Sequence, residues 1–176
     1  NIPLIHNNYF FLLIETGDYS DAERYIKRLI KKFPDNLYYR LDLGLLFLSS
    51  DGEQKAQTYF NNVIDDIKFD SYLTSITADY FVSKKLTQYA INTLLESRKA
   101  TKNPYSFSLE LANIYRIMNA KDLMVQEYLN YVSQNPSNLN YVKNTLQTLL
   151  SKPDELESLE RLLYDKIQLN PNSEIY

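Results

Sequence analysis

Four of the six prolines recur along the chain at nearly regular intervals, and this spacing is the feature that most limits how the chain can fold. Pro34, Pro104, Pro136 and Pro171 are separated by 70, 32 and 35 residues. The first interval spans two periods, and the proline expected between them is missing. Asp70 fills that place, in the segment Lys-Phe-Asp-Ser. A period near 34 residues therefore runs through the whole chain, which predicts an array of similar structural units.

Each period has the pattern of two helices, as the first unit shows. Gly17 can end a first helix in the left-handed backbone conformation. Apolar residues then recur with the spacing of one helix face, and they are Ala22, Ile26, Leu29, Ile30 and Phe33. Pro34 ends this second helix near the preceding residue. With only 3 Gly and 6 Pro in 176 residues, the chain favours helices with short connections over a many-stranded sheet.

We therefore expect an all-α fold of five helix pairs. The expected pairs are 4–16 with 20–33, 37–49 with 53–68, 71–83 with 86–100, 105–118 with 121–134, and 138–150 with 154–169. One pair cannot bury its apolar face alone, so each pair depends on its neighbours.

Small and aromatic residues recur inside these pairs at fixed places. In the second unit they are Leu43, Gly44, Phe47, Ala56, Phe60 and Val63. In the third they are Ala78, Phe81, Ala90 and Leu94, and in the fourth Leu111, Ala112, Tyr115, Tyr128 and Pro136. The first unit has Ala22, Ile26 and Pro34, but Phe10 where a small residue is usual. The fifth departs most, with Gln147, Leu159 and Leu163 at these places and only Pro171 conforming.

With this pattern the chain resembles the tetratricopeptide repeat (TPR) family over essentially all of its 176 residues. The resemblance implies one domain, a right-handed α-solenoid in which antiparallel helix hairpins stack into a superhelix. The repeats would span 3–36, 37–70, 71–104, 105–136 and 137–171. Gly44, Ala78 and Ala112 would lie where the helices of a hairpin cross closely, so we expect Gly44→Leu to overpack the crossing at a cost of about 1–3 kcal/mol.

Residue chemistry gives little sign of catalysis. Cysteine is absent, His6 is the only histidine, and neither a glycine-rich phosphate loop nor a nucleophile motif is present. We expect no enzyme activity, metal or cofactor, and a packed or surface role for His6. The net charge of −3 argues against nucleic-acid binding, and the longest apolar stretches are too short for a membrane-spanning helix. The compartment cannot be read from the sequence.

In TPR proteins the first helices of successive hairpins line a concave wall, and the resemblance implies that a protein or peptide partner binds there. The candidate groove residues are Asn7, Phe11, Tyr38, Leu41, Leu45, Leu48, Tyr72, Asp79, Asn113, Arg116, Tyr141 and Asn144. Tyr38, Tyr72 and Tyr141 recur at one register of the repeat, and tyrosine is frequent at binding hot spots. Packing of these rings against the preceding helix is an equally good interpretation.

The helix expected at 37–49 is apolar nearly all round, and so is the first helix. Leu41, Leu45 and Leu48 need a cover, which is either a partner or the neighbouring repeats. The apolar first helix indicates either a section of a longer chain or an N-terminal end that a partner covers, because solenoids usually close with polar caps. An apolar or helical ligand in the N-terminal half fits this pattern best.

The leading functional hypothesis is therefore a non-catalytic scaffold that binds a peptide or helix in its groove. The alternative is a structural spacer or oligomerisation module that packs on further repeats or on a symmetry mate. A helical-repeat RNA reader is a third class, which the acidic balance disfavours. Arg24, Lys27, Arg28, Lys31 and Lys32 form a basic run that suits either an acidic partner or the negative end of their own helix.

Overall fold

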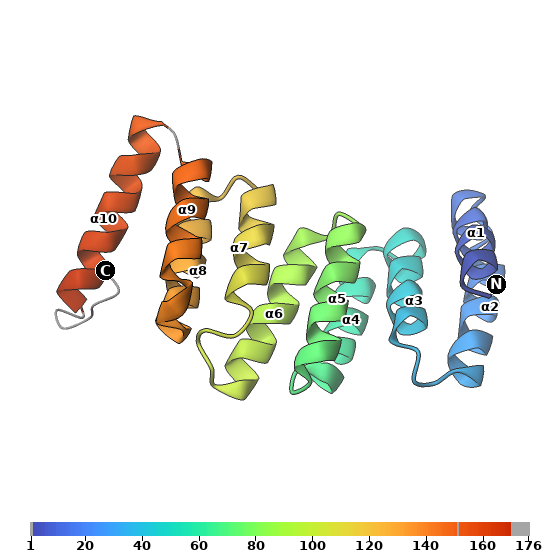
Figure 1. The fold of residues 1–176 in the computed structure, drawn as a ribbon. Coiled ribbons are helices and arrows are strands. Elements are labelled where there is room, and N and C mark those ends of the chain that lie inside the picture. Colours follow the sequence, from blue (N-terminus) through green and yellow to red (C-terminus); the bar gives the residue numbers. More distant parts are fainter. Residues whose placement is uncertain (1, 151, 170–176) are drawn as a thin grey trace. The chain divides into compact units, whose positions relative to one another are not determined.

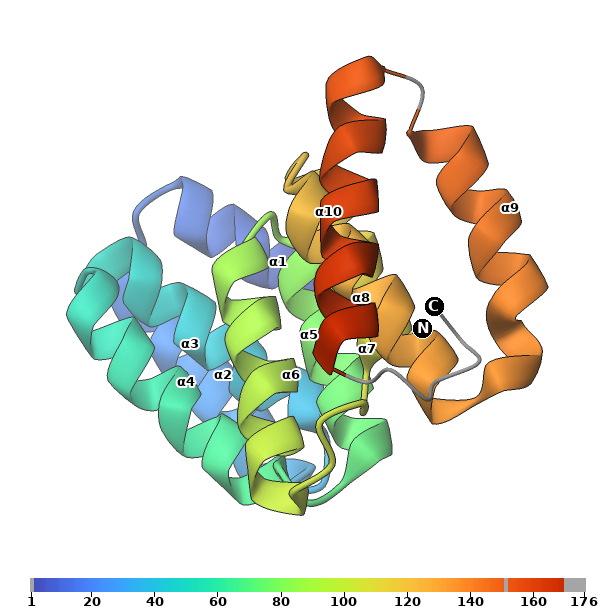
Figure 2. The same cartoon turned by 90° about the vertical axis from the view of Figure 1, so that its left-hand side faces the viewer.

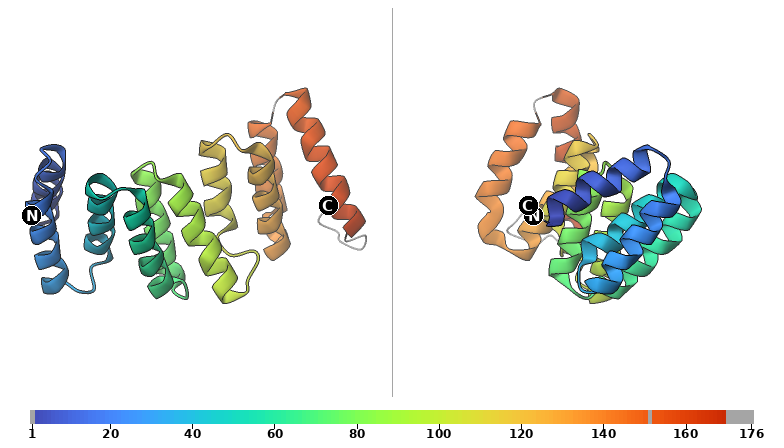
Figure 3. Two further views of the ribbon diagram at one scale, coloured as in Figure 1. Left: turned by 180° about the vertical axis from the view of Figure 1, so that it is seen from behind. Right: turned by 90° about the vertical axis from the view of Figure 1, so that its right-hand side faces the viewer.

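The computed structural model describes residues 2–150 and 152–169, and this part of the chain is helical without any strand (Figures 1 and 3). The α-helices are α1 (Ile2–Glu15), α2 (Tyr19–Lys32), α3 (Leu37–Ser50), α4 (Glu53–Ile67), α5 (Ser71–Ser83), α6 (Thr87–Thr101), α7 (Ser108–Ile117), α8 (Lys121–Gln134), α9 (Leu139–Leu149) and α10 (Pro153–Leu169). A 3₁₀ turn, η1 (Pro136–Asn138), precedes α9. The expected all-α repeat fold is confirmed. Pro171, the closing proline expected for the fifth repeat, lies outside the described residues.

Local sequence explains where several helices begin. Asn36 and Asp70 accept hydrogen bonds through their side chains from the backbone N–H groups of Tyr38 (3.1 Å) and Leu73 (2.9 Å). Asp70 thus caps α5 at the place where the proline stop is missing. The helix expected from residue 105 begins later, at Ser108, because Phe107 adopts a left-handed φ of 60°.

By its internal contacts the chain divides into two compact units, Asn1–Ile67 and Lys68–Tyr176. In the first unit α1 packs on α2, α2 on α3, and α3 on α4. Its core contains fully buried side chains from all four helices, among them Phe10, Ile26, Leu41 and Phe60. Gly44 lies against the ring of Phe60, so the expected close crossing of α3 and α4 is present.

In the second unit α5 packs with α6 and α7 with α8, and α6–α7 and α8–α9 contacts join successive pairs. Phe81, Leu94 and Leu111 are fully buried. A buried ion pair supports this packing, because the Arg98 guanidinium of α6 donates two hydrogen bonds, 2.9 and 2.8 Å long, to the Glu127 carboxylate of α8. The same guanidinium also donates to the carbonyl of Ser106, which holds the connection between α6 and α7.

The fifth pair departs from the other four. α10 makes its main contacts with α8, whereas α9 and α10 lie apart along most of their length (Figure 2). Val142 and Leu146 are the buried residues of α9, and Gln147, which the sequence placed in the hairpin seam, is exposed. The expected register of α9 was therefore wrong by one residue.

Candidate binding surfaces

In the first unit, neighbouring helices bury part of the groove that the sequence predicts. Leu41 has no exposed surface, because α3 is packed against both α2 and α4. It is therefore not available to a partner, and its prediction as a groove residue was wrong. Leu45 and Leu48 are half-buried on the same helix. Neighbouring helices thus cover much of the apolar surface that was expected to need a ligand.

The other predicted residues of the first unit reach solvent to different degrees. Asn7 and Tyr38 are exposed, whereas Phe11 is half-buried. These positions are accessible, and their role as partner contacts stays a prediction.

His6 is a packed histidine whose Nε2 lies 2.8 Å from Oδ2 of Asp42, and both residues are buried. Three aromatic rings surround the imidazole, with ring centres 5.4 Å away for Phe10, 5.7 Å for Tyr25 and 4.9 Å for Tyr39. The pair joins α1 to α3 inside the first unit. No group of three or more His, Cys, Asp or Glu side chains suited to a metal ion occurs among the described residues.

In the second unit the six remaining predicted groove residues are all exposed. They are Tyr72 and Asp79 on α5, Asn113 and Arg116 on α7, and Tyr141 and Asn144 on α9. A hydrogen bond of 3.4 Å from Ser75 Oγ to Glu110 Oε1 places α5 beside α7. These six side chains are accessible, and their role in binding also stays a prediction.

The three tyrosines of the predicted ladder do not occupy one register within their helices. Tyr38 and Tyr72 each lie six positions before the small buried residue of their helix, Gly44 and Ala78, whereas Tyr141 lies five positions before the buried Leu146. The Tyr141 ring also packs edge-on against Tyr131 of α8, with ring centres 6.4 Å apart. Tyr141 therefore does not share the register of the other two rings, and it packs on the preceding helix, as the competing interpretation expected.

A pocket of about 400 Å³ lies between α8, α9 and α10, where the fifth pair stays open. Most of its wall is aliphatic, and the polar side chains come from α9. The lining residues are Leu129, Val132, Leu139, Asn140, Val142, Lys143, Leu146, Gln147, Leu156, Leu159 and Leu163. The sequence does not predict a binding site here, although Leu159 and Leu163 mark this repeat as unusual.

The residue type at one position explains why this pair is open. Gly44, Ala78 and Ala112 are buried at equivalent positions of α3, α5 and α7, each 34 residues from the next, and Leu146 follows at the same interval in α9. At Gly44 even an added Cβ would lie 2.6 Å from Cζ of Phe60. A leucine side chain cannot fit into such a close crossing, so α9 and α10 cannot approach as the helices of the other pairs do.

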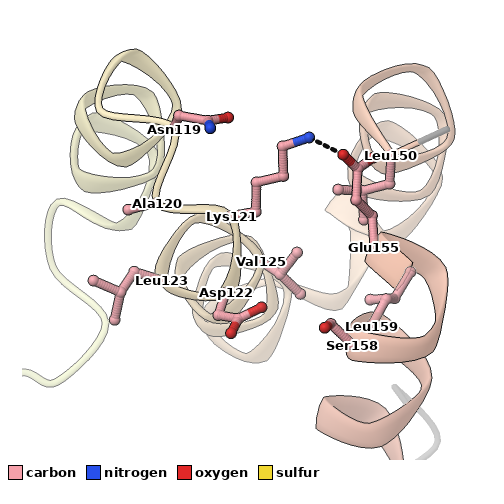
Figure 4. Close-up of a pocket in the computed structure, with 10 residues that line it drawn as sticks. All are labelled: Asn119, Ala120, Lys121, Asp122, Leu123, Val125, Leu150, Glu155, Ser158 and Leu159. Carbon is pink, nitrogen blue, oxygen red and sulfur yellow. Dashed lines mark hydrogen bonds and ion pairs between the residues drawn. The ribbon is translucent and has the colours of Figure 1, made fainter. Parts of the chain in front are cut away.

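Beside this pocket lies a more polar one of about 420 Å³ between the α7–α8 turn, the start of α8, and α10 (Figure 4). Lys121 of α8 forms an ion pair with the buried carboxylate of Glu155, which also accepts a hydrogen bond of 3.2 Å from the backbone N–H of Lys152. This contact attaches the start of α10 to α8. Because the Lys121 ammonium is paired with Glu155, this cation is not free to bind an anionic ligand.

No model of a known protein family matches the sequence, and a comparison with curated proteins finds no significant similarity. Among the described helices, none combines the length and the apolar character needed to cross a membrane.

Proposed function

We propose that the chain is a non-catalytic protein-binding repeat of the TPR type, and that its second unit binds an α-helix of a partner protein. The observation that carries this proposal is the apolar pocket of about 400 Å³ between α8, α9 and α10. The volume lies in the range of ordinary ligand pockets, which are mostly apolar and carry a few polar groups. Here Asn140, Lys143 and Gln147 supply the polar groups.

The closed pairs of the same chain indicate what kind of side chain fits this pocket. In the second pair the ring of Phe60, carried on α4, fills the crossing beside Gly44, and Leu94 of α6 is the buried equivalent in the third pair. Helices therefore supply aromatic and aliphatic side chains at this place of the repeat. The open pair lacks that filling, and an amphipathic helix with one or two large apolar residues would provide it.

This location replaces the one expected from the sequence. The N-terminal half was expected to bind an apolar ligand, but burial of Leu41 removes the centre of that surface. The pocket is in the C-terminal pair, and its α9 wall is a different face from the one that carries Tyr141 and Asn144, because neither residue lines it.

A direct test uses the second helix of the second pair as the probe. We expect a fluorescent peptide of residues 53–67, which carries Phe60 on the sequence of α4, to bind saturably in an anisotropy titration. The double variant L156E/L163E places two carboxylates in the apolar wall and should weaken binding about tenfold or more, since burying an unpaired charge is costly. The variant I117E makes the same type of change at an exposed residue outside the pocket, and it should bind the peptide like the parent chain.

The partner itself can be sought with a photo-crosslinking amino acid placed at position 163 or, as a control, at position 117. Protein adducts formed at position 163 and suppressed by excess peptide would support the proposal. Equal loss of peptide binding in L156E/L163E and I117E, or adducts at position 117 alone, would contradict it.

A further inference from the structure

The basic run of the first unit borders a hollow on the surface of α2. The hollow measures about 510 Å³, its floor is formed by Tyr25 and Leu29, and its rim carries Arg28, Lys31 and Lys32. All three cations are exposed. Arg28 and Lys31 have no ion-pair partner among the described residues, in contrast to Lys27, whose Nζ lies 2.6 Å from the Glu23 carboxylate. The hollow therefore suits a segment that is both apolar and acidic.

An exposed strip along α10 has this chemistry. Leu156, Glu160, Tyr164 and Ile167 follow one another at helical spacing and all are exposed. They border a shallow hollow of about 350 Å³, together with Leu159 and Leu163. Glu157, one helical turn before Glu160, adds a second exposed carboxylate. An apolar strip flanked by acids on α10 thus matches an apolar floor flanked by cations on α2.

We infer that copies of this chain associate head to tail, with this exposed strip of α10 of one copy bound in the basic hollow of α2 of the next. Apolar contact of Tyr164 and Ile167 with Tyr25 and Leu29 would supply affinity, and the opposite charges would set orientation and partner choice. The two surfaces are different, so the contact can repeat from copy to copy. This surface of α10 shares Leu156, Leu159 and Leu163 with the pocket proposed for a partner helix, whereas Glu160, Tyr164 and Ile167 do not line that pocket.

The inference can be tested by sedimentation velocity at low salt over a wide range of protein concentration. We expect the parent chain to associate, and the association to weaken as salt screens the charges. R28E/K31E places acids opposite acids, and E157K/E160K places cations opposite cations, so each variant alone should associate about tenfold more weakly or worse. K85E/K102E makes the same charge change as R28E/K31E at exposed positions outside the hollow, and it should associate like the parent chain.

Mixing the two charge-reversed variants provides the decisive measurement. Each variant keeps one surface of the parent chain, and the reversed surfaces are complementary to each other, so the mixture should recover association that neither variant shows alone. Such recovery also shows that the variants are folded. A parent chain that stays monomeric at every concentration, undiminished association of R28E/K31E, or failure of the mixture to associate would each overturn the inference.

Discussion

The contact between Gly44 and Phe60 makes a quantitative prediction about how closely α3 and α4 cross. A Cβ added to Gly44 would lie 2.6 Å from Cζ and 2.7 Å from Cδ1 of Phe60, and closer still to Cε1. These distances are well below carbon–carbon contact, so Gly44→Ala must displace a ring that has no exposed surface. Overpacking of this kind costs about 1–3 kcal/mol. Alanine also favours the helix over glycine by about 1 kcal/mol, so the net loss should be about 0–2 kcal/mol.

A double-mutant cycle separates these two contributions. Phe60→Leu shortens the side chain opposite Gly44, and together with Gly44→Ala it reproduces the Ala78 and Leu94 combination of the third pair. On this background Gly44→Ala should lose its steric cost and keep its helix propensity, so it should stabilise by up to about 1 kcal/mol. The coupling energy between the two positions should therefore be about 1–3 kcal/mol.

The assay is urea denaturation of the four chains, followed by far-ultraviolet circular dichroism. Because a repeat protein need not unfold in one step, the comparison should use the first transition affected by Phe60→Leu. A Gly44→Ala substitution that stabilises equally with Phe60 and with Leu at position 60 would show that the ring does not occupy this crossing. Gly44→Leu, which is larger, should cost more than Gly44→Ala on both backgrounds.

Three further predictions concern buried polar groups. Arg98→Met should destabilise the second unit by about 3–5 kcal/mol in urea denaturation, because it leaves the buried Glu127 carboxylate without its bidentate partner. The double variant R98M/E127L should recover most of this lost stability. A double variant as unstable as Arg98→Met would contradict this explanation. His6→Leu should lower the free energy of unfolding more than the double variant H6L/D42L does, because the single change removes the imidazole from a buried carboxylate. A double variant less stable than His6→Leu would refute this prediction. Burial raises the pKa of Tyr59 and of Tyr115 above the ordinary value of 10.0, so their contribution to stability is complete below pH 10 and is lost as the pH rises through the folded-state pKa. Y59F/Y115F should therefore show a weaker fall of the urea midpoint above pH 10 than the parent chain, and an equal fall would contradict the assignment.

Sequence alone predicts most of the fold, because the signals that define it are local. The proline period, the small residues at Gly44, Ala78 and Ala112, and the caps before α3 and α5 identify the pairs and their order. The boundary of α7 was missed because the left-handed Phe107 depends on a distant side chain, Arg98, that holds the preceding loop.

The binding surfaces were harder to predict, because apolar character does not reveal which neighbour covers a residue. Leu41 and Leu45 have equal hydrophobicity and lie on the same helix, but the first is fully buried and the second only half-buried. The open pocket could have been found from Leu146, which replaces a small residue at the crossing. The register chosen from the sequence pointed to Gln147 instead, and a shift of one residue turns a side chain through about 100° around a helix.

Polar contacts join successive pairs of helices in both units. His6 with Asp42 joins the first helices of the first two pairs, and Ser75 with Glu110 those of the third and fourth. Arg98 with Glu127 and Lys121 with Glu155 join second helices in the same way. Apolar seams built from similar residues in every repeat would allow neighbouring helices to pack in several registers. A polar pair forms its hydrogen bonds in only one of these registers. Buried ion pairs add little net stability, so we infer that these contacts set the register between successive helices. The two double variants, H6L/D42L and R98M/E127L, test this inference. Each should keep most of the stability of the parent chain but show more than one state in amide NMR spectra.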